Sequence, residues 1–120
     1  MYKRQEYYCI GFSSNKGKYT AGNSNGYSIS TDNNLVKSIA GSFDNNFSKA
    51  GSSMFFLDLK NISENDADSK WLFKKLYFRT IGGIATDNQF HPASIMEKFD
   101  GIIYIDRTTS TEPLYDKNGL

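Results

Sequence analysis

The stretch Gly22-Asn23-Ser24-Asn25-Gly26 fits the G-x-S-x-G pattern of a nucleophile elbow, in which a serine attacks a carbonyl carbon. Asp87 and His91 follow in the chain order of an α/β-hydrolase triad. An elbow also needs a buried strand before the serine and a helix directly after it. Residues 27–31 are instead extended and polar, so the pattern favours an ordinary loop. A self-contained serine hydrolase using Ser24 and His91 is therefore our third hypothesis.

Arg79 and His91 are the two candidates for substrate binding or for positioning a carboxylate. His91 is the single histidine, but its place just before Pro92, at an expected helix start, favours a capping or surface role. Arg79 lies in an otherwise apolar segment, where burial of an unpaired cation would be costly. It either faces a substrate cleft or, as we favour, forms a structural ion pair with Asp58 or Asp106 or lies at a solvent-exposed edge.

No metal or cofactor is expected from the residue types. One histidine and one cysteine, His91 and Cys9, cannot supply the three or four ligands of a zinc site without carboxylates. The acidic run at residues 64–68 lacks the glycine and the terminal glutamate of a calcium loop. With a single cysteine, an internal disulfide is excluded.

The composition describes one small domain of 120 residues. Its formal net charge is +1 and 22% of its residues are charged, which gives no electrostatic footprint for nucleic acid. No apolar run is long enough to cross a membrane. Nine Phe and eight Tyr supply much of the surface that a small core can bury.

The elements that must position these residues begin with residues 99–106. Four successive apolar residues, Ile102 to Ile105, predict a central strand that is buried on both faces. Further strands are expected at residues 6–12, 18–21, 54–59 and 76–81, the first two forming a hairpin across a turn at residues 13–17.

Helices are expected between these strands. A cap at Thr31 or Asp32 would begin a helix whose apolar stripe ends before Gly51, a natural stop. The stripe consists of Leu35, Val36, Ile39, Ala40, Phe43 and Phe47. Short helices are expected at residues 69–75 and from Pro92 onward. The alternation predicts an α/β fold with three layers, a mixed and mostly parallel sheet, an N-terminal β-hairpin and covering helices.

Three stretches together resemble the C-terminal part of the erythromycin esterase-like family, which includes proteins labelled as succinoglycan biosynthesis proteins. They are Tyr7-Tyr8-Cys9-Ile10-Gly11-Phe12 with Gly17-Lys18-Tyr19-Thr20-Ala21; Ser53 to Leu59; and Phe78-Arg79-Thr80-Ile81-Gly82 with Phe99-Asp100-Gly101-Ile102-Ile103-Tyr104-Ile105-Asp106. The resemblance implies a bacterial hydrolase that cleaves a macrolide lactone or a related ester, using a water activated by a His with Glu partners. The family's His and Glu motifs match no stretch here, so no catalytic residue is carried over.

The resemblance makes residues 6–114 the C-terminal part of such a hydrolase domain, a partial domain, and residues 115–120 a tail. Residues 1–5, Met-Tyr-Lys-Arg-Gln, are what a sequencing-library transposon end would encode from a GTG start, and we expect them to be a scar. The expected partners are the missing N-terminal half of the domain and a small-molecule ester. The chain alone should be inactive and prone to aggregate. The second hypothesis is a complete small α/β binding or interaction module without catalysis.

Overall fold

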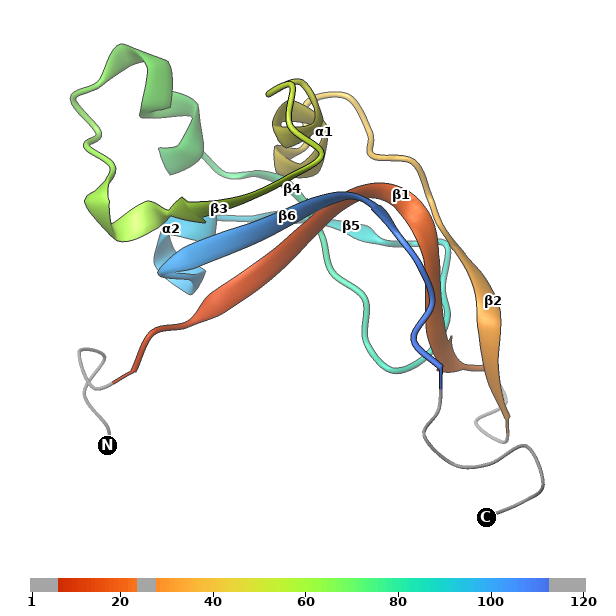
Figure 1. The fold of residues 1–120 in the computed structure, drawn as a ribbon. Helices are drawn as coiled ribbons and strands as arrows, with labels where there is room; N and C mark the ends of the chain where they lie inside the picture. The colour runs from red at the N-terminus through yellow and green to blue at the C-terminus, as the bar shows by residue number, and fades with distance from the viewer. Residues whose placement is uncertain (1–6, 24–27, 113–120) are drawn as a thin grey trace.

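The computed structural model describes residues 7–23 and 28–112 as a four-stranded sheet and a two-stranded sheet with short helices (Figure 1). The larger sheet has the order β2-β1-β6-β3, and the smaller sheet pairs β4 with β5. The strands are β1 (Ile10–Gly22), β2 (Ile29–Leu35), β3 (Met54–Asp58), β4 (Leu76–Arg79), β5 (Phe90–Ala93) and β6 (Gly101–Thr108). Two α-helices, α1 (Phe43–Ser48) and α2 (Ile95–Lys98), and two 3-10 helices, η2 (Leu59–Asn61) and η3 (Ala67–Phe73), connect them.

The prediction of a mostly parallel sheet is wrong, although the fold is a mixture of helices and strands as expected. Among the described strands only β1 and β6 pair in parallel. The pairs β1–β2, β3–β6 and β4–β5 are antiparallel. The physical reason lies in the connections, because short links such as the one between β1 and β2 return the chain antiparallel.

The predicted hairpin exists, but at a different place in the chain. β1 runs through the turn expected at residues 13–17, and its partner in the hairpin is β2. Ser13, Ser14 and Asn15 are buried rather than exposed turn residues. Figure 1 shows β1 and β6 running side by side and bending together. At Gly17, where φ is +133°, a Cβ atom would lie 2.3 Å from the carbonyl oxygen of Thr108, so only glycine fits this close approach.

The long helix predicted from Thr31 or Asp32 is wrong. Residues 29–35 form β2 instead. Pairing with β1 favours the extended conformation of this polar segment more strongly than the spacing of its apolar residues favours a helix. The helix begins only at Phe43, where the side chain of Ser42 accepts a 3.0 Å hydrogen bond from the backbone N–H of Asn45. Gly41, with a φ of +85°, separates the two segments.

The short helix expected from Pro92 exists as α2 but begins only at Ile95, because Pro92 lies in β5 opposite Tyr77 of β4. Proline is compatible with an edge strand because its missing N–H removes no central ladder bond. The strands at residues 54–59, 76–81 and 102–105 and the short helix at residues 69–75 are confirmed as β3, β4, β6 and η3. β4, however, belongs to the two-stranded sheet and not to the main one.

The core lies on one face of the larger sheet, under α1, η3, β4 and α2. Its buried members are Phe43, Phe47, Leu59, Leu72, Phe78, Ala93, Ile95, Ile102 and Tyr104. On the opposite face, Phe12, Met54 and Phe56 are exposed. Within residues 7–23 and 28–112 the sheet is therefore covered on one face, not on both as a three-layer fold and a doubly buried β6 would require.

The far end of β1 holds the loop that connects β4 to β5. The N–H of Gly22 donates to the carbonyl of Gly83 at 2.7 Å, and the N–H of Ala85 donates to the carbonyl of Gly22 at 2.8 Å. These bonds form an isolated parallel bridge between Gly22 and Ile84. No helix among the described residues is long and apolar enough to span a bilayer.

Candidate functional site

Arg79 ends β4 and directs its guanidinium toward the main chain of two other segments. Its Nη2 donates to the carbonyl oxygens of Val36 at 2.6 Å and Asn15 at 3.0 Å. Both Nη2 and Nε reach the carbonyl oxygen of Ser14 at 3.4 Å. The residue is 7% exposed, and the guanidinium lies 4.6 Å from the centre of the Phe90 ring. Arg79 thus joins β4 to the bend of β1 and to the segment after β2.

Gln89 completes the set of acceptors around this cation. Its side-chain oxygen accepts from Nη1 of Arg79 and, at 2.9 Å, from the backbone N–H of Val36. Its amide nitrogen donates to the carbonyls of Asn34 at 3.1 Å and Thr86 at 2.9 Å. Gln89 is 1% exposed, so this polar side chain is buried but fully used. No pattern in the sequence marks Gln89 as a functional or structural residue.

Asp44, in α1, is a carboxylate that contacts Arg79. Its Oδ2 accepts from the backbone N–H of Arg79 at 2.9 Å, and its Oδ1 accepts from the hydroxyl of Ser13 at 2.5 Å. Burial raises the pKa of Asp44, and the two hydrogen bonds and the charge of Arg79 only partly oppose this. Burial likewise lowers the pKa of Arg79, which the charge of Asp44 opposes.

The structural ion pair predicted between Arg79 and either Asp58 or Asp106 is wrong. Asp58 accepts from the hydroxyl of Tyr8 at 2.6 Å, and Asp106 accepts from the hydroxyl of Tyr104 at 2.8 Å. These bonds lower the pKa of each carboxyl. The reason is topological: β4 lies outside the sheet that carries both aspartates, so carbonyl groups of crossing segments take the place of the expected carboxylate.

His91 is an exposed residue of β5, and its ring lies beside Thr80. The hydroxyl of Thr80 and Nδ1 of His91 are 2.7 Å apart. Sequence reasoning missed this pair because the antiparallel register of β4 and β5, with Phe78 opposite His91, was not predicted. In the described part of the chain, no hydrogen bond joins Asp87 to His91. Ser24 lies outside the described residues, so the elbow stays a prediction.

A cavity of about 400 Å³ opens between β1, the end of β4 and β6. Arg79 contributes the one charged side chain of its wall. The residues lining the cavity are Gly11, Phe12, Ser13, Ser14, Leu35, Phe78, Arg79, Thr80, Ile81, Phe99, Ile105 and Thr108. The donors of Arg79 are directed to other groups of the protein, so what the cavity offers is mainly apolar contact. Within residues 7–23 and 28–112, no three His, Cys, Asp or Glu side chains come together as a metal site would require.

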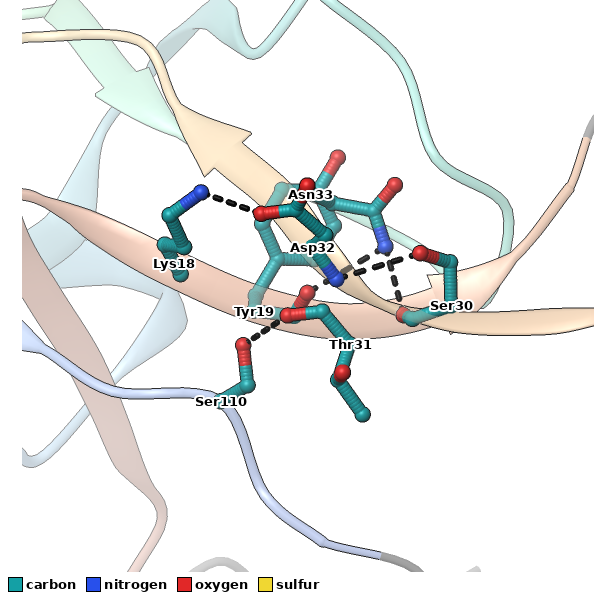
Figure 2. Close-up of polar contacts among 7 residues, drawn as sticks. All are labelled: Lys18, Tyr19, Ser30, Thr31, Asp32, Asn33 and Ser110. Atoms are coloured by element: carbon teal, nitrogen blue, oxygen red, sulfur yellow. Dashed lines mark hydrogen bonds and ion pairs between the residues drawn. The ribbon is translucent and has the colours of Figure 1, made fainter.

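A second polar cluster holds the β1–β2 hairpin together (Figure 2). Lys18 pairs with Asp32 across the hairpin, and this pairing lowers the pKa of Asp32. The side-chain nitrogen of Asn33 donates to the carbonyls of Ser30 at 2.7 Å and Tyr19 at 3.2 Å. The side chains of Lys18 and Asp32 are 49% and 80% exposed, so solvent screens the pair, and a structural role in the hairpin is the simplest account.

The sequence profile of the erythromycin esterase family matches residues 1–108. This chain belongs to the erythromycin esterase family. The match covers β1 through β6, so the whole described sheet is part of the family domain. No curated protein matches the chain.

Two solved structures superpose on most of this chain. One, from Bacillus cereus, superposes with a TM-score of 0.77 at 21% identity, over 94% of this chain and 27% of its own. The other, a succinoglycan biosynthesis protein, superposes with a TM-score of 0.73 at 28% identity, over 89% of this chain and 25% of its own. The chain spans about a quarter of the length of these solved relatives.

Proposed function

We propose that this chain is the part of a family hydrolase that supplies a sheet and its covering helices, while the acid and base residues lie on the rest of the domain. The family match over residues 1–108 is the observation that carries the proposal. The buried network around Arg79 supports it, because its guanidinium binds main-chain carbonyls and Gln89 and so acts as a structural tie. The quarter-length overlap with the solved relatives is consistent with a partial domain.

The proposed reaction is hydrolysis of a macrolide lactone or a related cyclic or linear ester, as the family resemblance implies. A His with Glu partners, on the part of the domain that precedes this stretch in the family, would take a proton from a water molecule. The water oxygen then bonds to the carbonyl carbon, the ester C–O bond breaks, and a proton passes to the leaving alkoxide. The contribution of this chain is to hold the sheet that supports that site.

The test compares the chain alone with a reconstituted domain. The purified 120-residue protein is incubated with erythromycin and with a simple aryl ester, and mass spectrometry detects addition of one water. We expect no turnover by the chain alone. We expect turnover when it is co-expressed with the three quarters of the succinoglycan relative that it does not match. As a control, the same three quarters are co-expressed with the relative's own matching quarter, which shows whether they are a competent partner. Turnover by the chain alone would contradict the proposal.

A non-catalytic interaction module is the second candidate, and one observation favours it. Phe12, Met54 and Phe56 are exposed on one face of the larger sheet, at 67%, 63% and 52%. Exposed apolar patches of this kind mark surfaces that bind another protein. A folded chain that binds a protein partner, with no ester turnover in the reconstituted domain, would favour this candidate over the hydrolase.

A further inference from the structure

One edge of β1 has no strand beside it among the described residues. β1 pairs with β6 from Ile10 onward, whereas its pairing with β2 begins only at Gly17. Between Ile10 and Ser13 the second edge of β1 therefore has no strand paired with it among the described residues. An open edge presents unpaired N–H and C=O groups that can bind another strand.

The backbone N–H and C=O groups of β1 point alternately toward β6 and away from it. The carbonyl of Cys9 accepts from the N–H of Asp100 at 2.7 Å and so points toward β6. Both main-chain groups of one residue in a parallel strand point the same way, and the next residue points the opposite way. Gly11 and Ser13 therefore face β6, while Ile10, Phe12 and Ser14 point outward. The carbonyl of Ser14 already accepts from Nε of Arg79 at 3.4 Å, so the open part of the edge ends at Ser13.

The side chains beside this edge form an unfinished apolar row. Phe12 is in register with Ile103 of β6, which is in register with Phe56 of β3. Phe12 is 67% exposed, more than any other large apolar side chain that the structure describes. A further strand beside β1 would cover Phe12 and continue the row, as cross-strand neighbours do in a sheet.

The cavity of about 400 Å³ adjoins the same edge. Gly11, Phe12, Ser13 and Ser14 contribute to its wall, and Phe78 and Phe99 line it from the core. A strand added at the edge would direct alternate side chains into this apolar space. Backbone bonds then give affinity and the pocket gives specificity, as in other cases where a strand is added to a sheet.

We propose that an extended β-strand with alternating apolar side chains, from the remainder of the family domain, pairs with β1 along Ile10–Ser13. The choice of this occupant follows from length, because the solved relatives carry about three quarters of their chain beyond the matched part. The inference rests on the proposed assembly with the rest of the domain, but not on hydrolysis. It places the contact between the two parts at the edge of β1 and in the cavity.

A proline at position 12 tests this edge directly. The N–H of Phe12 points away from β6, so Phe12→Pro removes the outward donor while leaving the β1–β6 ladder intact. Phe12→Val is the matched control, since valine is similar in size to proline and keeps the N–H. The tagged chain is co-expressed with the unmatched three quarters of the succinoglycan relative and recovered by its tag.

We expect the wild type and Phe12→Val to retain the partner and Phe12→Pro to retain about tenfold less. Amide exchange should show the N–H of Phe12 slowed at least about tenfold by the partner, while Gly11 and Ser13 are already protected in the isolated chain. Equal retention by Phe12→Pro, or no retention where the relative's own matching quarter succeeds, would overturn the proposal. So would protection of Phe12 in a dimer of this chain alone.

The same samples separate this inference from the proposed function. Retention through the edge without ester turnover would support the inference and contradict the hydrolase. Turnover that Phe12→Pro leaves unchanged, with equal retention, would support the hydrolase and overturn the edge as the contact.

Discussion

The backbone N–H of Arg79 donates a 2.9 Å hydrogen bond to Oδ2 of Asp44, a carboxylate that is 0% exposed. This single contact joins the last residue of β4 to α1, and the guanidinium of the same arginine joins β4 to the bend of β1. The two-stranded sheet is thereby tied to the core through polar groups as well as through Phe78.

Asp44→Asn should change how stability depends on pH. The folded pKa of Asp44 is raised by burial, so its contribution is fully present below the unfolded pKa and is lost as pH rises through the folded pKa. Asparagine is neutral and can still accept from Arg79, so we expect the variant to gain on the wild type as pH rises from about 4 toward neutral. Urea unfolding across this range measures it, and a constant difference would contradict the prediction.

Arg79→Met should destabilise the protein by about 3–5 kcal/mol, because the carbonyl of Val36 loses its donor, and the acceptors of Asn15 and Gln89 each lose one of two donors. Arg79→Lys should destabilise the protein by less than Arg79→Met does, because one ammonium group can reach some, but not all, of the acceptors that the planar guanidinium spans. Urea unfolding measures both changes. Arg107→Met, at an exposed position, is the control and should have little effect. A loss equal to that of the control would show that the network is not stabilising.

Gly101→Ala should destabilise the sheet by about 1–3 kcal/mol. A Cβ atom at Gly101 would lie 2.7 Å from Cζ of Phe56 and 2.7 Å from the hydroxyl of Tyr8, well inside contact distance. Gly82→Ala is the control, because nothing lies within 4 Å of a Cβ atom there. Thermal unfolding measures both, and the penalty at Gly101 should shrink when Phe56→Leu makes room.

Met54→Lys should reduce self-association of the chain expressed alone. Met54 lies in β3, an edge strand of the larger sheet, and its side chain is 63% exposed. A lysine on an exposed edge opposes pairing between sheets of different molecules. Light scattering against concentration should show a smaller assembly than for the wild type. Identical scattering would place the contact on another surface.

Strands with continuous apolar residues were predictable from the sequence, and the polar strand was not. β6 and β3 read correctly because runs such as Ile102 to Ile105 are too short for a buried helix. β2 is Ile-Ser-Thr-Asp-Asn-Asn-Leu, with little local strand preference, and only its pairing with β1 makes it a strand. The antiparallel arrangement depends on which strands pair with each other, so the local sequence of one strand does not predict it.

Arg79 illustrates how far the reasoning about sites could go. Its apolar neighbours indicated that an unpaired cation would be costly to bury, and Arg79 is buried with several hydrogen-bond partners. The partners themselves are carbonyl groups of Ser14, Asn15 and Val36, and every residue carries such a group, so no side-chain pattern marks them. Asp44 and Gln89 were missed for a related reason, because their importance comes from burial by elements far apart in the chain.

The bridge between Gly22 and Ile84 has a consequence for local unfolding. Two backbone hydrogen bonds fasten the tip of the hairpin to a segment that follows two glycines and has little apolar burial of its own. If one side detaches, the other loses its anchor, so both segments should open in the same event. The rate of proteolytic cleavage after Gly83 would then measure how often the hairpin opens, although the hairpin lies some sixty residues earlier in the chain.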